Sequence, residues 1–160
     1  MTMADATFED GAERVLRVRA EVAEDVPVIS ALVQDAVLPI TEMRWDRQAR
    51  KLALLLNRFR WEDQGAADAQ GRAYERVQSL LILGGVLGVS SQGIDRGEAA
   101  TVLSVLSLTW EPQADGAGRV VLVLAGDGAI AVEVECLDLV LKDVTRPYLA
   151  PSGKLPSHPQ

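Results

Sequence analysis

The densest group of side chains suited to ligand binding is basic and lies in one short stretch of the sequence. Six of the 16 basic residues fall within 17 positions: Arg44, Arg47, Arg50, Lys51, Arg58 and Arg60. Arginine binds phosphate and carboxylate groups in bidentate fashion and also stacks on aromatic rings. In a chain of net charge −7, such a group favours the binding of an anionic partner.

The alternation around this group predicts a hairpin with two distinct faces. Arg44, Arg58 and Arg60 are expected on one face with exposed guanidinium groups. Trp45, Phe59 and Trp61 are expected on the other. We predict an anionic-partner site of Arg44, Arg58, Arg60 and Trp61. The alternative is a solvated face whose arginines form cross-strand pairs with Glu42, Asp46 and Glu62.

A second polar group occupies a predicted loop at 92–100. Ser91, Gln92, Asp95 and Arg96 are candidates for a polar ligand site, and Asp95, Arg96 and Glu98 for carboxylate and arginine chemistry. The alternative is a turn in which these side chains satisfy the local backbone.

Other familiar catalytic and metal-binding patterns are missing from the sequence. The single histidine is His158, in a proline-rich stretch, and the single cysteine is Cys136. Zinc sites and nucleophile–histidine pairs need more of these residues, and neither a phosphate loop nor a dinucleotide-binding glycine motif is present. We therefore predict no catalytic residues, no metal and no cofactor.

The carboxylates and the cysteine have simpler interpretations. Glu133 and Glu135 alternate on a predicted strand at a separation that two catalytic acids could have, but a solvated face is the expected role. Cys136 is expected to be buried as a small hydrophobic side chain at the start of a helix, since Glu133, Glu135 and Asp138 oppose a lowered thiol pKa.

Length and composition predict one domain in a reducing compartment. The chain has 160 residues, 48% of them hydrophobic and 24% charged, which fits a single globular domain. A lone cysteine, an acidic start without a signal-like pattern and the lack of a long apolar run predict a cytoplasmic protein without membrane insertion. The negative net charge makes nucleic-acid binding an unfavoured role.

The hydrophobic periodicity predicts mostly strands. We expect strands at 15–22, 41–46, 51–62, 74–83, 86–91, 101–111, 120–125 and 129–135, and a long mobile loop at 63–73. Strand 51–62 should be central because 52–56 is apolar on both faces. Tight hairpins are expected at Gly84-Gly85 and at Gly126-Asp127-Gly128.

Two amphipathic helices are expected. The first covers 26–38, with Asp25 as N-cap and Pro27 in its first turn. The second covers 137–144, where Leu137, Val140, Leu141 and Val144 recur at helical spacing. The predicted domain organisation is a disordered start at 1–13, one β-rich domain at 14–146 and a proline-rich tail at 147–160 that packs neither as helix nor as sheet.

This element order predicts an α+β fold. Strands joined by short turns form an antiparallel sheet, here a closed or half-open barrel of seven to eight strands. One helix follows the first strand, and a C-terminal helix caps the barrel. That layout resembles a pleckstrin-homology-like barrel, a likeness of element order that implies no ligand.

Three segments also resemble a known group of proteins. Residues 32–61, 89–96 and 132–154 are similar to an uncharacterised family of small cytoplasmic proteins from alphaproteobacteria. The resemblance implies a single domain in a bacterial cytoplasm, and no activity.

We therefore carry three hypotheses for the unknown function. The favoured one is a non-enzymatic binding or scaffold domain that contacts a protein or a small anionic ligand, with a homo-oligomer left open. The second is an enzyme using Asp95, Arg96 and Glu98. The third and least favoured is nucleic-acid binding through the arginine hairpin.

Overall fold

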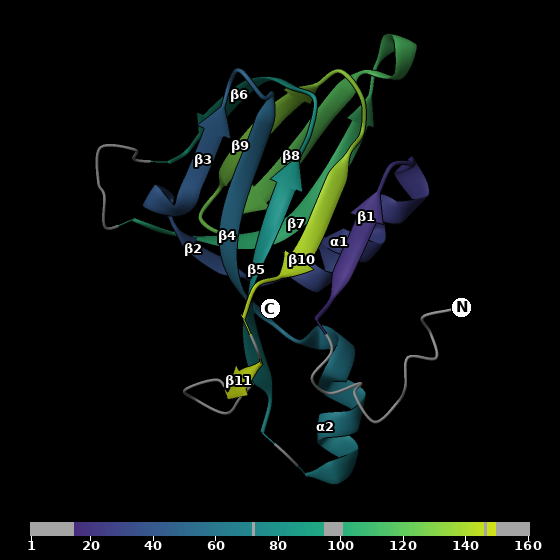
Figure 1. Ribbon diagram of the computed structural model, residues 1–160. Coiled ribbons are helices and arrows are strands. Elements are labelled where there is room, and N and C mark those ends of the chain that lie inside the picture. Colours follow the sequence, from purple (N-terminus) through teal and green to yellow (C-terminus); the bar gives the residue numbers. More distant parts are fainter. Residues whose placement is uncertain (1–14, 72, 95–100, 146, 150–160) are drawn as a thin grey trace.

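Figure 1 shows the computed structural model, which describes residues 15–71, 73–94, 101–145 and 147–149. The helices of this part are α1 (Val26–Val33) and α2 (Gln64–Gln70). Its strands are β1 (Arg17–Ala20), β2 (Val37–Pro39), β3 (Met43–Asp46), β4 (Lys51–Phe59), β5 (Glu75–Leu83), β6 (Val86–Gln92), β7 (Val102–Pro112), β8 (Gly118–Leu124), β9 (Gly128–Val134), β10 (Leu139–Asp143) and β11 (Tyr148–Leu149). Short 3₁₀ turns lie at Ala23–Asp25, Ile40–Glu42, Trp61–Asp63 and Ala114–Gly116.

The strands form one antiparallel sheet that folds over on itself. Their hydrogen-bonded order is β1-β10-β5-β4-β2-β7-β8-β9-β6, with β3 beside β4 and β11 beside β5. The short strand β2 is the bridge, since Val37 pairs with Asn57 of β4 and with Ser104 of β7. We call the part from β1 to β4, with β3 and β11, the first half, and β7, β8, β9 and β6 the second half. In Figure 1 the first half lies in front of the second.

The α+β class and the mostly antiparallel sheet are confirmed. Within the described residues, β1 and β6 end the strand order and do not pair with each other, so the sheet is open. Closure into a barrel is therefore not confirmed, and the pleckstrin-homology-like arrangement remains a prediction.

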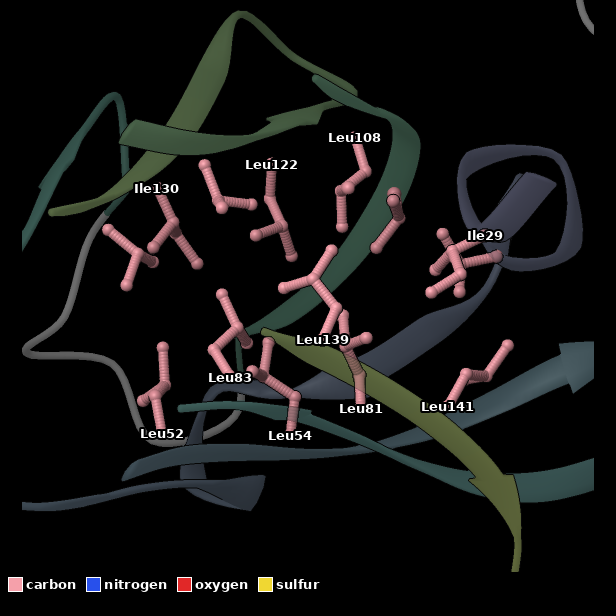
Figure 2. Packing of buried hydrophobic residues seen from close by; sticks show 14 of the residues in the cluster. Ile29, Leu52, Leu54, Leu81, Leu83, Leu108, Leu122, Ile130, Leu139 and Leu141 are labelled. Atoms are coloured by element: carbon pink, nitrogen blue, oxygen red, sulfur yellow. The ribbon is translucent and has the colours of Figure 1, made fainter. Parts of the chain in front are cut away.

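The core lies between the two halves. Alternate side chains of a strand point to opposite faces of the sheet, and in β4 Leu52, Leu54 and Leu56 are buried while Leu55 is half-buried. Figure 2 shows Leu54 of the first half and Leu122 of the second extending toward the same space. Each fully buried leucine contributes about 1.5–3 kcal/mol, so the two inner faces hold the sheet in its bent form.

The first helix is shorter than expected. It begins at Val26, with Pro27 in the first turn as predicted, but it ends at Val33, and the Asp25 side chain makes no capping hydrogen bond. Asp35 has a φ of 64° and turns the chain into the sheet. Its N–H donates to Val105 O at 2.8 Å, and Val105 N–H donates to Ala36 O at 2.9 Å. Sheet hydrogen bonds have thus replaced the last helical turn, and the predicted helix over 34–38 is wrong.

The predicted mobile loop at 63–73 is also wrong, because 64–70 forms α2. This helix has only Ala67 buried, so its sequence carries no apolar stripe that would predict it. Alanine and glutamine are good helix formers. Gly71 ends the helix with a φ of 65°, which favours glycine.

The predicted C-terminal helix at 137–144 is a strand instead. β10 pairs with β1 on one side and with β5 on the other, so the backbone groups of both edges are satisfied. Leu137, Leu139 and Leu141 are buried and Val144 is 45% exposed. Positions 137 and 141 are four apart, and that spacing fits both helical and strand periods. Leu139 is buried as well and lies two residues from each of them, which fits only the period of a strand.

One glycine turn is a hairpin and the other is not. Gly126 and Asp127, with φ values of 81° and 65°, connect the paired strands β8 and β9 as predicted. β5 instead pairs with β4 and β10, and β6 pairs with β9. The hairpin at Gly84-Gly85 is therefore wrong, and these glycines carry the chain from the first half to the second. A Cβ on Gly84 would lie 2.6 Å from Asp138 Oδ2, and Gly85 has a φ of 66°, so a glycine pair suits this crossing.

The predicted tail begins with β11, which pairs with β5, so its first residues do join the sheet. The predicted disordered start at 1–13 and the rest of the tail lie outside the described residues. The strand predicted at 51–62 ends earlier, because β4 stops at Phe59 and a 3₁₀ turn follows at Trp61–Asp63. It is central as expected, since β4 has β5 on one side and β2 and β3 on the other. The sheet so assembled determines which charged side chains are enclosed and which reach solvent.

Candidate functional site

The predicted exposed arginine face is wrong at its central residue. The Arg58 side chain is 0% exposed because it continues the inward alternation of Leu52, Leu54 and Leu56 along β4. All five N–H donors of its guanidinium group are used. They donate to Ser79 Oγ at 2.9 Å, to Phe59 O at 3.0 Å, to Glu62 Oε1 and Oε2 at 2.9 and 3.0 Å, and to Asp143 Oδ1 at 2.9 Å.

The partners of Arg58 are themselves held in place. Ser79 Oγ donates to Asp143 Oδ1 at 2.7 Å, and Leu16 N–H donates to Asp143 Oδ2 at 3.1 Å. Burial alone would lower the pKa of Arg58, but the hydrogen bonds and charges of Glu62 and Asp143 outweigh it and raise that pKa. Burial alone would raise the pKa of Glu62, and the Arg58 hydrogen bond and charge reverse this to a lowered pKa. We call Arg58, Ser79, Asp143 and Glu62 the buried charge cluster.

Arg60 and the aromatic residues extend this cluster. The Arg60 side chain is 5% exposed and ion-pairs with Glu75, with a longer contact of 3.6 Å to Asp63. Phe59, expected on the opposite face, is also buried, and the guanidinium carbon of Arg76 lies 3.9 Å from its ring centroid. Trp61 Nε1–H donates to Gln34 O at 2.9 Å. Of the predicted anionic-partner site, only Arg44 is exposed.

The polar loop can be examined only at its start. Ser91 and Gln92 end β6 and line a depression of about 220 Å³ with Glu111 and Arg119. Asp95, Arg96 and Glu98 lie outside the described residues. Arg119 already binds an internal carboxylate, since its Nε–H donates to Glu133 Oε2 at 2.6 Å.

The other chemical candidates do not meet. Glu133 binds Arg119, whereas Glu135 binds Arg50 at 3.1 Å, so the two acids hold different arginines. Cys136 is exposed, and the prediction that it is buried is wrong because no helix covers it. Within the described ranges no group of three or more His, Cys, Asp or Glu residues could hold a metal ion. No helix in that part of the chain is both long enough and apolar enough to cross a membrane.

A basic surface that the sequence analysis missed lies on the outer side of the first half. Strand register places five side chains there: Arg17, Arg19, Arg44, Lys51 and Lys142. They surround a half-buried apolar centre formed by Ala53, Leu55, Leu80, Ile82 and Val140. We call this surface the basic face. In Figure 1 no helix among the described elements crosses the outer side of β4, β5 and β10.

The charges of the basic face are only partly compensated. Arg19 donates to Asp138 Oδ1 at 3.0 Å and lies 3.6 Å from Glu21. Arg17, Lys51 and Lys142 form no ion pair with any described residue, and together with Arg19, Ile82, Val140 and Asp138 they line a depression of about 290 Å³. The signal for this surface was present in the sequence as Arg17, Arg19 and Lys142, but it required the pairing of β1 with β10.

A groove of about 540 Å³ lies between α1 and β7. Its walls include Pro27, Ser30 and Ala31 of α1 and Leu106 and Trp110 of β7. Ser30 Oγ accepts a hydrogen bond from Leu108 N–H at 3.0 Å. The groove and the basic face have no lining residue in common.

The comparisons with known proteins give a family and no activity. A family model described as "protein of unknown function (DUF2948)" matches residues 16–158. The chain belongs to this family. The predicted resemblance to an uncharacterised family is thereby confirmed. No curated protein and no solved structure matches the chain.

The DUF2948 match contains both surfaces and the buried charge cluster. It begins at Leu16, whose N–H binds Asp143, and continues beyond β10. The paired strands β1 and β10 thus both fall within the family domain.

Proposed function

We propose that this DUF2948 protein is a non-enzymatic binding domain and that its basic face holds an acidic segment of a partner protein. The observation that carries the proposal is the set of three cations, Arg17, Lys51 and Lys142, without an ion pair to a described residue in a chain of net charge −7. Cations without an internal partner attract anions locally, even where the net charge of the chain is negative.

The arrangement of the face favours an amphipathic protein segment. Arg44 of β3 and Arg19 of β1 lie at the two ends of one cross-strand row that includes Ala53, Ile82 and Val140. Four interstrand spacings separate the ends, about 19 Å. A segment lying along this row would place carboxylates at both ends and apolar side chains over the centre. Interfaces of this kind combine an apolar centre with a polar rim.

The proposal extends to the setting of the protein. The family resemblance implies a bacterial origin and a cytoplasmic location, and we include both in the proposal. Of the element order that suggested a pleckstrin-homology-like arrangement, the helix after the first strand is present and the C-terminal helix is a strand, so that arrangement is proposed on the first part alone. A binding role is consistent with all three.

The test uses a defined probe and a charge reversal. We would measure binding of a fluorescent peptide of Glu-Glu-Leu repeated four times, and of its Gln-Gln-Leu counterpart, by fluorescence anisotropy at two salt concentrations. The wild-type protein should bind the acidic peptide more tightly, and higher salt should weaken that binding. The triple variant Arg17→Glu, Lys51→Glu, Lys142→Glu should lose at least about tenfold in affinity, as desolvated charge contacts do.

The matched control reverses one exposed arginine elsewhere. Arg47 stacks on Trp45, with 4.4 Å from its guanidinium carbon to the ring centroid. Arg47→Glu reverses one cation and therefore changes the net charge as much as Lys142→Glu does. Only Lys142→Glu should weaken binding. Equal effects of the two variants, equal binding of both peptides, or tighter binding of a 16-nucleotide single-stranded DNA than of the acidic peptide would each overturn the proposal.

A further inference from the structure

The groove between α1 and β7 contains a stretch of strand edge without a neighbouring strand. β2 pairs with β7 only at Val102, Leu103 and Ser104. Val105 still exchanges backbone hydrogen bonds with Asp35 and Ala36. Beyond Val105 the same edge of β7 faces α1, while the other edge pairs with β8. An unpaired strand edge presents backbone N–H and C=O groups that can hydrogen-bond to another chain.

Strand geometry identifies the groups that point into the groove. Leu108 N–H is directed away from β8, because it donates to Ser30 Oγ on α1. Backbone groups of an antiparallel strand alternate between its two edges, so Leu108 C=O and both backbone groups of Trp110 point to the α1 side. None of these three groups has a backbone partner among the described residues. Pro112, two positions on, has no N–H and ends the available edge.

The walls of the groove determine the chemistry of what fits it. None of its lining residues is charged. Leu106 is 37% exposed, and the α1 wall presents the small side chains of Ser30 and Ala31. Its volume of about 540 Å³ is within the usual range for ligand pockets. An uncharged, partly apolar chain with its own main-chain hydrogen-bonding groups satisfies all of these surfaces.

We infer that the groove binds an extended, uncharged peptide segment through main-chain hydrogen bonds to Leu108 C=O and Trp110 N–H and C=O. The segment adds to the sheet as a short strand beside β7, and its side chains contact Leu106 and the small residues of α1. Recognition of this kind takes its affinity from backbone pairing and its specificity from alternate side-chain pockets. The site is independent of the basic face, because it uses other strands and no charge.

The inference is tested with a phage-displayed library of random seven-residue peptides. Peptides retained by the wild-type protein are expected to be uncharged at the central positions. One selected peptide is then synthesised with an N-methyl group on each backbone amide in turn. Methylation of alternate amides should weaken binding at least about tenfold and methylation of the amides between them should not, since only every second N–H faces β7.

Two substitutions on α1 provide the matched protein controls. Ala31 lines the groove, whereas Val28 is 52% exposed and does not. Ala31→Trp should abolish binding, and Val28→Trp should leave both binding and the thermal midpoint unchanged. Lys142→Glu should also bind the peptide normally, which separates this result from the test of the basic face.

The inference is overturned if no peptide is retained above the level of the Ala31→Trp protein. It is equally overturned if the position of the N-methyl group makes no difference, or if both tryptophan variants weaken binding alike. If Ala31→Trp lowers the thermal midpoint, the alternation of the N-methyl effect on the wild-type protein decides alone.

Discussion

Two sets of cations in the first half of the sheet have opposite surroundings. Arg58 has no exposed side-chain surface and five internal hydrogen bonds. Lys142 lies on the outer side of the neighbouring part of the sheet and has no ion pair with a described residue. The first cation is fully satisfied by the fold, and the second has no ionic partner within the described part of the chain.

A single step along one strand separates these roles. Lys142 and Asp143 are consecutive in β10, so their side chains point to opposite faces. Asp143 points inward to Arg58, and Lys142 points outward beside Arg17, its register partner in β1. Strand parity, more than the number of arginines in a stretch, therefore decides whether a charge supports the fold or is offered to a partner.

The largest effect is expected from removing the buried cation. Arg58→Met leaves Asp143, whose side chain is 3% exposed, without its cation, and leaves Glu62 only the 3.9 Å contact to Arg60. Breaking a buried ion pair on one side costs about 3–5 kcal/mol. Urea denaturation should show this as a lower midpoint with an unchanged slope.

The control for this variant removes charges on both sides. Arg58→Met combined with Asp143→Leu and Glu62→Gln should recover part of the loss, because the uncompensated carboxylates are gone. A loss below about 1 kcal/mol in the single variant, the size typical of surface pairs, would remove the distinction between the two sets.

A comparable loss is expected at the inner neighbour of Lys142. Leu141 is 0% exposed, and Leu141→Ala should cost about 2–5 kcal/mol through lost burial and the cavity left behind. The thermal midpoint, measured beside that of Lys142→Ser, reports the difference between the inner and outer faces of β10. A shift of Leu141→Ala no larger than that of Lys142→Ser would show that β10 is not part of the core.

The pH dependence of stability should reflect the buried charge cluster. Arg58 stays protonated, so the titrating partner is Glu62, whose pKa is lowered from its ordinary 4.5. A carboxyl group whose pKa is lower in the folded than in the unfolded state stabilises the fold at a pH above its unfolded-state pKa. This stability is lost as the pH falls through the folded-state pKa. The free energy of unfolding should therefore drop below pH 4.5, and Glu62→Gln should show a smaller drop. Parallel curves for the two proteins would contradict this.

The smallest effect is expected on the basic face. Arg17→Ser and Lys142→Ser remove charges on the outer side of the sheet that form no ion pair with a described residue, so the free energy of unfolding should change by less than about 0.5 kcal/mol. Urea titrations of both variants test this. A destabilisation above 1 kcal/mol would mean that these cations hold the fold together as Arg58 does.

Much of the strand pattern was predictable from local alternation. β8 and β9 were expected because their apolar residues alternate and a glycine turn joins them, and the central place of β4 because 52–56 is apolar on both faces. β10 was mistaken for a helix because apolar residues four apart fit the period of a helix and that of a strand. The strand is stabilised by its two partner strands, which lie far away in the sequence. α2 was missed because a helix with one buried residue has no periodic signal.

The candidate site was less predictable. Arg58 shares its parity with Leu52, Leu54 and Leu56, so its inward direction could have been inferred from the sequence. Its partners could not, because Ser79 and Asp143 join it only through the β4–β5 and β5–β10 pairings. The basic face likewise combines Arg17 with Lys142, residues that local sequence does not connect.

The pairing of β1 with β10 also determines when the fold can form. Arg17 and Lys142 are register partners, so the edge strand made first must wait for one of the strands made last. At about 5–20 residues per second, synthesis separates the two by roughly 6–25 s. From the synthesis of β5 until that of β10, β5 lacks one neighbour and Arg58 has Glu62 but lacks Asp143, so the nascent chain holds an unpaired strand edge next to a cation with only part of its partners. The pairing of β10 thus acts as the closing step of folding, and a chain released before β10 would present this edge for aggregation.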